Sequence, residues 1–301
     1  MSELNAAGIH DPELRASYAE CKRLNSLHGK TYYLATLLLP AAKRPFVHAL
    51  YGFARYADEI VDDLSSTLSP EEKAKVLRDW SAEVLAGLKT GKTSDAVGKA
   101  LIDTVQRFDI PHQHFVDFLH SMEMDLTVTE YKTFEDLYEY VYGSAAVIGL
   151  EMVPILGGDI VNSLSAAKDL GVAFQLANFI RDVDEDLDRG RIYLPIEELA
   201  EHGVTPEMLR ARVLTPQIIS ALKFQIARVR QLQKSAEPGI ALLDKTSQPC
   251  IRAASELYCG IVDEVEKIGY DIFNKRAKTS NARRARVAGR AYIDAVLARI
   301  G

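Results

Sequence analysis

Two short stretches of the sequence place carboxylates at a spacing that could hold a divalent cation. Residues 178–188 read NFIRDVDEDLD, and residues 51–63 read YGFARYADEIVDD. Residues four apart in a helix lie on one face, roughly 6 Å apart along the axis, so Asp182 and Asp186 should project together. Like charges at this spacing destabilise a helix unless positive charge compensates them, as a bound cation would.

The two stretches share one arrangement, in which polar or basic side chains precede an aspartate pair on the same helical face. These are Gln175 and Asn178 before Asp182 and Asp186, and Tyr51 and Arg55 before Asp58 and Asp62. If the two faces oppose one another across a helical bundle, their carboxylates line one cavity from both sides.

Carboxylate oxygens offered in pairs suit magnesium, which keeps several waters and is commonly completed by phosphate oxygens. Mn²⁺ is a second candidate, and the expected ligand is a diphosphate. An EF-hand calcium loop is excluded, because counting from Asp182 the required glycine is Leu187 and the required glutamate is Tyr193. Two simpler alternatives stay open: a solvated acidic face, and a non-catalytic helical protein that binds divalent cations.

The elements that must position these residues are helices. Apolar residues recur at spacings of three and four through most of the chain, and strand alternation is nearly absent. We expect about eight to ten helices of the usual length, in a single all-α domain over residues 1–301, because no repeat or linker divides the sequence. The predicted breaks lie at Pro40 and Pro45, Ser69-Pro70, GLKTGKTSD, Pro111, Gly157-Gly158, RGRIYLP, GVTPEM and Pro238-Gly239.

Composition restricts the partners and the compartment. The 301 residues are 48% hydrophobic with a net charge of −6, which argues against nucleic acid as a partner. Three scattered cysteines indicate a reducing cytoplasm. We expect no signal peptide and no transmembrane segment, since Glu151 and Pro154 interrupt the longest apolar run.

Several motifs together resemble a known family. DEIVDD and NFIRDVDEDLDRGRIYLP are similar to the two aspartate-rich signatures of the head-to-head prenyl synthases, which make squalene, dehydrosqualene and phytoene. The resemblance extends through HGKTYYLATLLLP, MEMDL, YVYGSAAVIG and GYDIF, in the expected order over nearly the whole chain. Within the family, the second signature and GYDIF look most like bacterial phytoene synthases.

The resemblance implies an all-helical isoprenoid synthase fold around a deep central cavity, with Mg²⁺ held by the aspartate motifs. The implied metal ligands are Asp58, Asp62, Asn178, Asp182 and Asp186. The implied substrate-binding residues are His28, Lys30, Thr31, Tyr32, Arg55, Gln175, Asn178, Tyr258, Arg276 and Lys278. Tyr142 falls at a tyrosine position that family members place beside the reacting diphosphates, and joins the four aspartates as an implied catalytic residue.

The implied reaction condenses two prenyl diphosphates to a cyclopropyl diphosphate and then to a linear hydrocarbon. Loss of a proton is the expected last step, and no NADPH is expected, because the sequence has no strand-flanked dinucleotide fingerprint. The small Thr36 favours a C20 substrate, and thus phytoene, over the C15 alternative that gives dehydrosqualene or presqualene diphosphate. A head-to-tail prenyltransferase or terpene cyclase is disfavoured, since neither a DDxxD nor an NSE/DTE motif is present.

Residues 275–290 carry seven positive charges and no acid. A solvated basic helix face is the simplest interpretation. The alternatives are closure of a diphosphate-binding mouth through Arg276 and Lys278, and transient contact with an anionic membrane surface. The sequence leaves the oligomeric state open.

Overall fold

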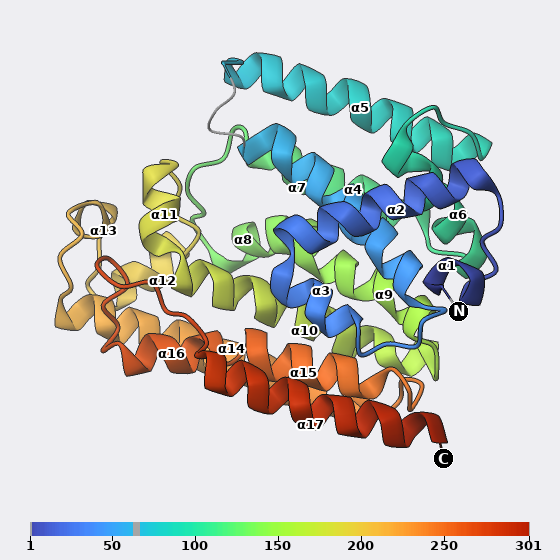
Figure 1. Ribbon diagram of the computed structural model, residues 1–301. Helices are drawn as coiled ribbons and strands as arrows, with labels where there is room; N and C mark the ends of the chain where they lie inside the picture. Colours follow the sequence, from blue (N-terminus) through green and yellow to red (C-terminus); the bar gives the residue numbers. More distant parts are fainter. Residues whose placement is uncertain (1, 63–66, 301) are drawn as a thin grey trace.

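The computed structural model describes residues 2–62 and 67–300, and of Asp62 the backbone alone (Figure 1). Within these ranges the chain is helical and forms no strand, only isolated bridges between Glu130 and Ile192 and between Gly158 and Leu243. The all-α prediction is confirmed. The helices are α1 (Glu3–Ala6), α2 (Pro12–His28), α3 (Lys30–Thr36), α4 (Arg44–Asp62), α5 (Pro70–Thr90), α6 (Ala96–Phe108), α7 (His112–Met124), α8 (Phe134–Val141), the π-helical turn η1 (Tyr142–Ala146), α9 (Val147–Leu156), α10 (Ile160–Arg181), α11 (Val183–Asp188), α12 (Ile196–Glu201), α13 (Pro206–Arg210), α14 (Pro216–Ile240), α15 (Gln248–Tyr258), α16 (Ile261–Lys267) and α17 (Asn281–Ile300).

Most predicted helix boundaries are confirmed by the capping residues. The Ser69 hydroxyl accepts from the Glu72 amide while the Glu72 carboxylate accepts from the Ser69 amide, a capping box that starts α5 before Pro70. At the other end of α5, Gly91 takes a left-handed conformation with φ 74°. Gly157 ends α9 in the same region of φ.

One boundary prediction is wrong. The break predicted at Pro238-Gly239 is misplaced, since α14 runs on to Ile240. Proline is tolerated there because the helix ends within a turn, so few backbone hydrogen bonds are lost. Six of the seventeen described α-helices are short, with seven residues or fewer, and Phe134–Leu156 is one helical run, so ten longer helices remain, as predicted.

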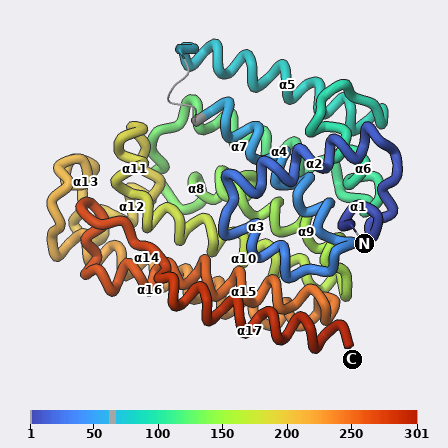
Figure 2. The backbone as a smooth tube through the Cα atoms, viewed as in Figure 1, coloured from blue at the N-terminus to red at the C-terminus, as the bar shows by residue number. Residues whose placement is uncertain are grey.

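Helix α10 runs through the middle of the molecule between two groups of helices (Figures 1 and 2). α14 packs along it on one side together with α15 and α16, while α9 and η1 pack on the other. One hydrophobic core joins α2, α4, α5, α6 and α7, and a second joins α8, α10, α14 and α16. α10 therefore contacts three other elements that carry predicted site residues, η1, α11 and α15.

Small residues let α10 approach η1 and α9 closely. A Cβ added to Gly171 of α10 would lie 2.4 Å from the Ala145 carbonyl oxygen, and one added to Gly149 of α9 would lie 2.3 Å from that of Ala167. These distances are too short for any side chain. Glycine at both positions thus sets how closely the two sides of the central region pack.

One helical run among the described residues, Phe134–Leu156, is long and apolar enough to cross a membrane by length and composition. The run passes through Glu151 and Pro154, which the sequence predicts as interruptions. Most of it is buried inside the fold, as expected for a core helix. Glu151 is accommodated because burial raises the pKa of its carboxyl well above the usual value and keeps it protonated.

Candidate active site

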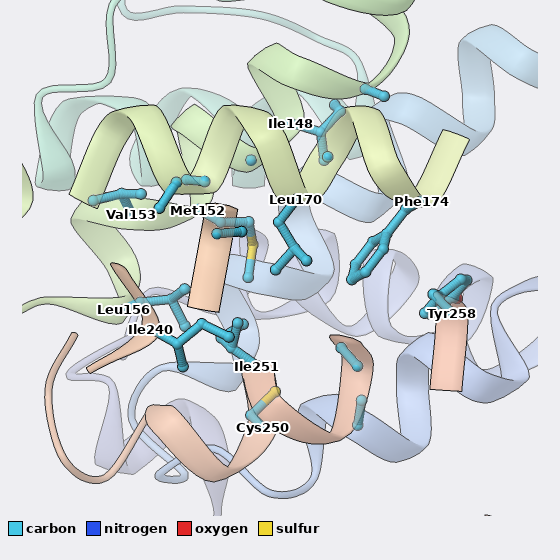
Figure 3. A pocket seen from close by; sticks show the side chains of 18 of the residues that line it. Ile148, Met152, Val153, Leu156, Leu170, Phe174, Ile240, Cys250, Ile251 and Tyr258 are labelled. Carbon is cyan, nitrogen blue, oxygen red and sulfur yellow. The ribbon is translucent and has the colours of Figure 1, made fainter. Parts of the chain in front are cut away.

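An apolar cavity of about 250 Å³ lies between α10 and the helices that surround it (Figure 3). Phe174 and Tyr258 lie at one end of this cavity, and Val153, Leu156 and Ile240 lie at the other. Gln175 and Asn178 of α10 line it, as do Tyr32 and Thr36 of α3. Four predicted substrate-binding residues, Tyr32, Gln175, Asn178 and Tyr258, and the predicted length-determining residue Thr36 therefore share one apolar chamber.

A second cavity, of about 260 Å³, is lined by cationic side chains. It is bordered by Arg181, Arg276, Lys278 and Arg284, together with the hydroxyl groups of Thr31 and Thr279. Tyr258 lines both cavities. The apolar chamber and the cationic cavity thus adjoin at Tyr258, an arrangement that suits a ligand with a hydrocarbon tail and an anionic head.

The second acidic segment is not one continuous helix. α10 ends at Arg181, and Asp182 has φ −101° and ψ 14° before α11 begins at Val183. Hydrogen bonds from the Asp182 amide to the Asn178 carbonyl and from the Asp186 amide to the Asp182 carbonyl, both 2.8 Å, preserve the four-residue relation. Aspartate is favoured at the start of a helix, but here its carboxylate binds arginines rather than capping α11.

Arginines compensate the carboxylates of this segment. Asp182 accepts from the adjacent Arg181 in a bidentate contact, with Nε of Arg181 2.7 Å from Oδ1. Nη2 of Arg276 lies 3.1 Å from the same oxygen, and Nη1 lies 2.5 Å from Oε1 of Glu185. Arg181 and Arg276, which both line the cationic cavity, therefore neutralise part of the negative charge of this segment.

Asp184 and Asp188 have a separate partner. Arg212, which follows α13 with a positive φ of 54°, places Nη1 3.2 Å from Oδ1 of Asp184 and also pairs with Asp188. These two acids need no metal to balance them. The segment thus divides into a pair held by Arg212 and the predicted ligands Asp182 and Asp186.

Asp186 is buried with less compensation. It is 8% exposed, and Nη1 of Arg189 lies 3.7 Å from its Oδ1. Burial, followed by the negative charge of Asp182, raises the pKa of Asp186 to about 7. Its ionised form would be favoured by additional positive charge.

The buried carboxylate of Asp125 holds the connection that follows the second acidic segment. Asp125 accepts hydrogen bonds from the hydroxyl groups of Tyr193, at 2.8 Å, and Tyr140, at 2.7 Å. Nη2 of Arg191 donates to the Asp125 backbone carbonyl at 2.9 Å. The connection after α11 is therefore attached to α8 and to the end of α7.

The first acidic helix carries the predicted arginine–aspartate pair. Nη1 of Arg55 lies 2.6 Å from Oδ2 of Asp58, and Nη2 lies 3.1 Å from Oε1 of Glu59. Nε2 of His28 lies 3.6 Å from the same Glu59 oxygen. The backbone of Asp62 continues the helix, while its side chain lies outside the described part of the chain.

Three tyrosines link the two acidic regions electrostatically. Burial raises the pKa of Tyr32 and Tyr258, and raises that of Tyr51 to about 12. Tyr258 adds to the shift of both other tyrosines, Asp58 adds to that of Tyr51, and Arg181 acts on Tyr258 in the opposite direction. All three hydroxyls keep their protons at neutral pH and can donate hydrogen bonds.

The side chains predicted to hold the metal offer oxygen atoms, which are the ligands that magnesium binds in proteins. Oδ1 of Asn178 is a buried oxygen without a hydrogen-bond partner, on a residue that lines the apolar cavity one turn before Asp182. Among the described residues, no three His, Cys, Asp or Glu side chains converge on one point. The ends of α4 and α11 lie at the same end of the molecule (Figure 1), and convergence of all four aspartates stays a prediction.

Several implied residues line neither the apolar nor the cationic cavity, among them His28, Lys30, Arg55 and Tyr142. Tyr142 begins η1 and contacts Tyr138 ring to ring, while Ser144 and Ala145 of the same turn line the apolar cavity. Lys30 is exposed at the first residue of α3 and lines neither cavity. Their proposed roles stay predictions.

Sequence reasoning missed Arg181, Thr279 and Arg284 of the cationic cavity. Helical spacing directs adjacent side chains about 100° apart, so it could not pair Arg181 with Asp182. The break at Asp182 allows that contact. The sequence offered one signal for a cationic cavity, the excess of arginine in the residues that follow GYDIF.

An all-α fold around an apolar chamber that adjoins a cationic cavity defines the class of the protein: it has the isoprenoid synthase fold. A solved dehydrosqualene synthase in complex with a ligand superposes with a TM-score of 0.85 at 27% identity, covering 93% of this chain and 96% of that one. Squalene synthase HpnC from Alicyclobacillus acidocaldarius gives 0.79 at 25% identity, covering 88% of this chain and 99% of the other. The squalene/phytoene synthase family model matches residues 26–283, and the chain belongs to this family of head-to-head prenyltransferases.

Relatives within the family are similar over most of the chain. The 15-cis-phytoene synthase of Synechococcus elongatus is 37% identical over 276 residues, which cover 88% of each protein. The chloroplastic phytoene synthase of Narcissus pseudonarcissus is 37% identical over 286 residues. That alignment covers 93% of this chain and 66% of the longer plant protein, so this chain spans about two thirds of its length.

Proposed function

We propose that the protein is a phytoene synthase, which joins two molecules of geranylgeranyl diphosphate head to head. The reaction forms prephytoene diphosphate, with loss of one diphosphate and one proton, and then phytoene, with loss of the second diphosphate and a second proton. The observation that carries the proposal is the apolar chamber next to the cationic cavity, with Tyr258 lining both. Identity of 37% to phytoene synthases supports the choice within the family.

The cationic cavity binds the diphosphate in this proposal. Arg181, Arg276, Lys278 and Arg284 neutralise its charge, and Thr31 and Tyr258 donate hydrogen bonds to its oxygens. His28, Lys30 and Arg55 approach from the α2–α4 side, and Tyr32, Gln175 and Asn178 hold the carbons next to the diphosphate. In this proposal Tyr142, the first residue of the π-helical turn η1, also acts on the reacting diphosphates.

Magnesium, or manganese in its place, would be held by Asp58, Asp62, Asn178, Asp182 and Asp186, and would neutralise the charge that develops on the departing diphosphate. Burial of Asp186 keeps it short of positive partners, and Asn178 offers an unused oxygen. We therefore propose that these residues bind the metal together with the substrate.

The apolar chamber protects the allylic cation from water. Its walls are almost entirely hydrocarbon, and Phe174 stacks on Tyr258 with ring centroids 4.9 Å apart at the mouth. Aromatic faces stabilise nearby positive charge. No hydride donor is needed in the proposed reaction, because proton loss ends it.

A C15 substrate is the second candidate, favoured by the similarity to the dehydrosqualene synthase structure. Thr36 is a small residue in the chamber wall, where a larger side chain would shorten the space for the tail. This favours the C20 substrate.

Product analysis tests the proposal. The purified protein is incubated with Mg²⁺ and either the C15 or the C20 diphosphate, with and without NADPH, and the hydrocarbon mass is measured. Phytoene from the C20 substrate without NADPH is the expected product. Turnover of the C15 substrate alone would contradict the assignment.

We further propose that residues 1–301 act as one domain in the cytoplasm. The chamber is lined by elements from α3 to α15, so no part of that range could form it alone. The three cysteines, Cys21, Cys250 and Cys259, are buried and unpaired, as a reducing compartment favours.

A further inference from the structure

The outer face of α17 carries a stripe of exposed apolar side chains. Four of the fifteen large hydrophobic residues exposed in the described ranges lie in its last nine residues: Tyr292, Ile293, Leu297 and Ile300, exposed by 63, 59, 62 and 79%. Their spacing of one, four and three residues puts them on one side of a helix. The opposite side, with Val287, Ala291 and Ala295, is buried against the protein.

Isolated exposed hydrophobic residues are ordinary, but a contiguous exposed patch marks an interaction surface. α17 lies at the outer edge of the molecule, next to α15 (Figure 1). α15 supplies Cys250, Ile251, Ala254 and Tyr258 to the wall of the apolar chamber. The stripe therefore lies one helix away from the space proposed to hold a lipid.

Positive charge accompanies the stripe. α17 contains five arginines and one acid, Asp294, whereas the whole chain has a net charge of −6. Arg286 and Arg290 are exposed beside Ile293 and Leu297, with Nη2 of Arg286 3.7 Å from a Glu256 carboxylate oxygen. Asp294 lies about 100° around the helix from Ile293 and about 60° from Leu297, so this one acid borders the stripe.

The remaining arginines have other partners. Arg283 pairs with Asp263 and Glu264, and Arg284 lines the cationic cavity. Nη2 of Arg299 donates to the Leu38 carbonyl at 2.6 Å, which attaches the end of α17 next to the end of α3. These contacts hold the helix in place with its apolar side outward.

We propose that this face of α17 docks on an anionic phospholipid bilayer, with Tyr292, Ile293, Leu297 and Ile300 entering the interface and Arg286 and Arg290 contacting lipid phosphates. An apolar stripe beside basic residues is the pattern of helices that lie in the plane of a membrane surface. A second copy of the chain fits less well, because the two facing helices would both be positively charged. Docking would place the wall of the chamber close to the membrane.

Vesicle flotation tests the inference without substrate, so its outcome is separate from that of the proposed activity. The full chain is floated with vesicles of phosphatidylcholine alone and of phosphatidylcholine mixed with phosphatidylglycerol. We expect the wild-type protein to float with the mixed vesicles and to be released by salt. Ile293→Asn with Leu297→Asn should lower the partition coefficient by roughly tenfold or more.

Two further variants separate the causes. Arg286→Gln with Arg290→Gln should remove the difference between the two vesicle types. Ile160→Asn with Val161→Asn, which changes two exposed residues of α10 on another part of the surface, should float as the wild type does. Circular dichroism establishes that each variant is folded.

The inference is overturned if the wild-type protein stays unbound with mixed vesicles, or if the folded Ile293→Asn, Leu297→Asn variant floats equally well. Light scattering supplies a further decisive result. A wild-type dimer that these substitutions dissociate, without any flotation, would assign the stripe to a second copy of the chain.

Discussion

Nη2 of Arg276 lies 3.1 Å from Oδ1 of Asp182, although 94 residues separate the two in sequence. The contact joins the basic segment after α16 to the acidic segment after α10. It places a cation that lines the cationic cavity on a predicted metal ligand. Arg276 can therefore contact both the carboxylate and a bound diphosphate.

Replacing Arg276 should weaken substrate binding. Arg276→Ala is expected to lower kcat/KM about tenfold, because a charge-assisted hydrogen bond to diphosphate is lost. Steady-state kinetics with Mg²⁺ measure the change. Arg78→Ala is the control, since Arg78 is a similarly exposed arginine paired with Glu123 away from both cavities. Equal effects of the two substitutions would contradict the role of Arg276.

Asp182 and Asp184 should differ in function despite their proximity. Asp182→Asn is expected to lower kcat by about 100-fold or more, because a ligand that stabilises charge on the leaving group is lost. Asp184→Asn removes only a partner of Arg212 and should change kcat within a few-fold. The rates are measured over a range of Mg²⁺ concentrations. A large loss in both variants would mean that the segment acts through its fold alone.

The side chain at position 36 should control substrate length. Thr36 is buried in the chamber wall, and its hydroxyl donates to the Tyr32 carbonyl at 2.9 Å. Thr36→Phe is expected to shift the ratio of kcat/KM for C20 over C15 by roughly tenfold or more towards C15. Thr36→Val keeps the volume and removes only the hydroxyl, so its ratio should match the wild type. An unchanged ratio in Thr36→Phe would show that the tail does not pass this residue.

Glu151 should make stability depend on pH. Its carboxyl is fully buried without a hydrogen-bond partner, and burial raises its pKa well above 4.5. Below pH 4.5 the Glu151 carboxyl is protonated in both the folded and the unfolded protein. As the pH rises, this carboxyl ionises only in the unfolded chain, so the free energy of unfolding falls. The fall stops once the pH has passed the pKa of Glu151 in the folded protein. The loss is at most about 1.4 kcal/mol per pH unit.

Glu151→Gln cannot titrate and supplies the comparison. Urea unfolding at pH 5 and pH 8 should show that the advantage of the variant over the wild type grows with pH. Parallel pH profiles for the two proteins would rule out a titrating Glu151.

The close contact at Gly171 should be intolerant of a methyl group. Gly171→Ala is expected to destabilise the fold by about 1 to 3 kcal/mol, because the new Cβ meets the Ala145 carbonyl oxygen. Gly289→Ala, in an exposed helix with open space around it, should stabilise by about 0.5 to 1 kcal/mol. Thermal melts compare the two. A Gly171→Ala variant as stable as the wild type would show that α10 and η1 can move apart.

The sequence by itself determined the helical class, most helix boundaries, the family and the two acidic segments. These features are local: a repeat of 3.6 residues, a capping serine or an Asp pair four apart specifies its structure through neighbours in the chain. The family follows from the order of such motifs. Asp182, Asn178 and Arg55 could all be named on this basis.

Only the tertiary structure decided which cations face which carboxylates. Arg276 reaches Asp182 across 94 residues, and Arg212 reaches Asp184 from a separate loop. The joining of the apolar and cationic cavities at Tyr258 likewise depends on how α3, α10 and α15 pack. Side-chain periodicity gives the direction of a residue from its own helix axis, whereas the identity of its partner is set by the packing of helices distant in sequence.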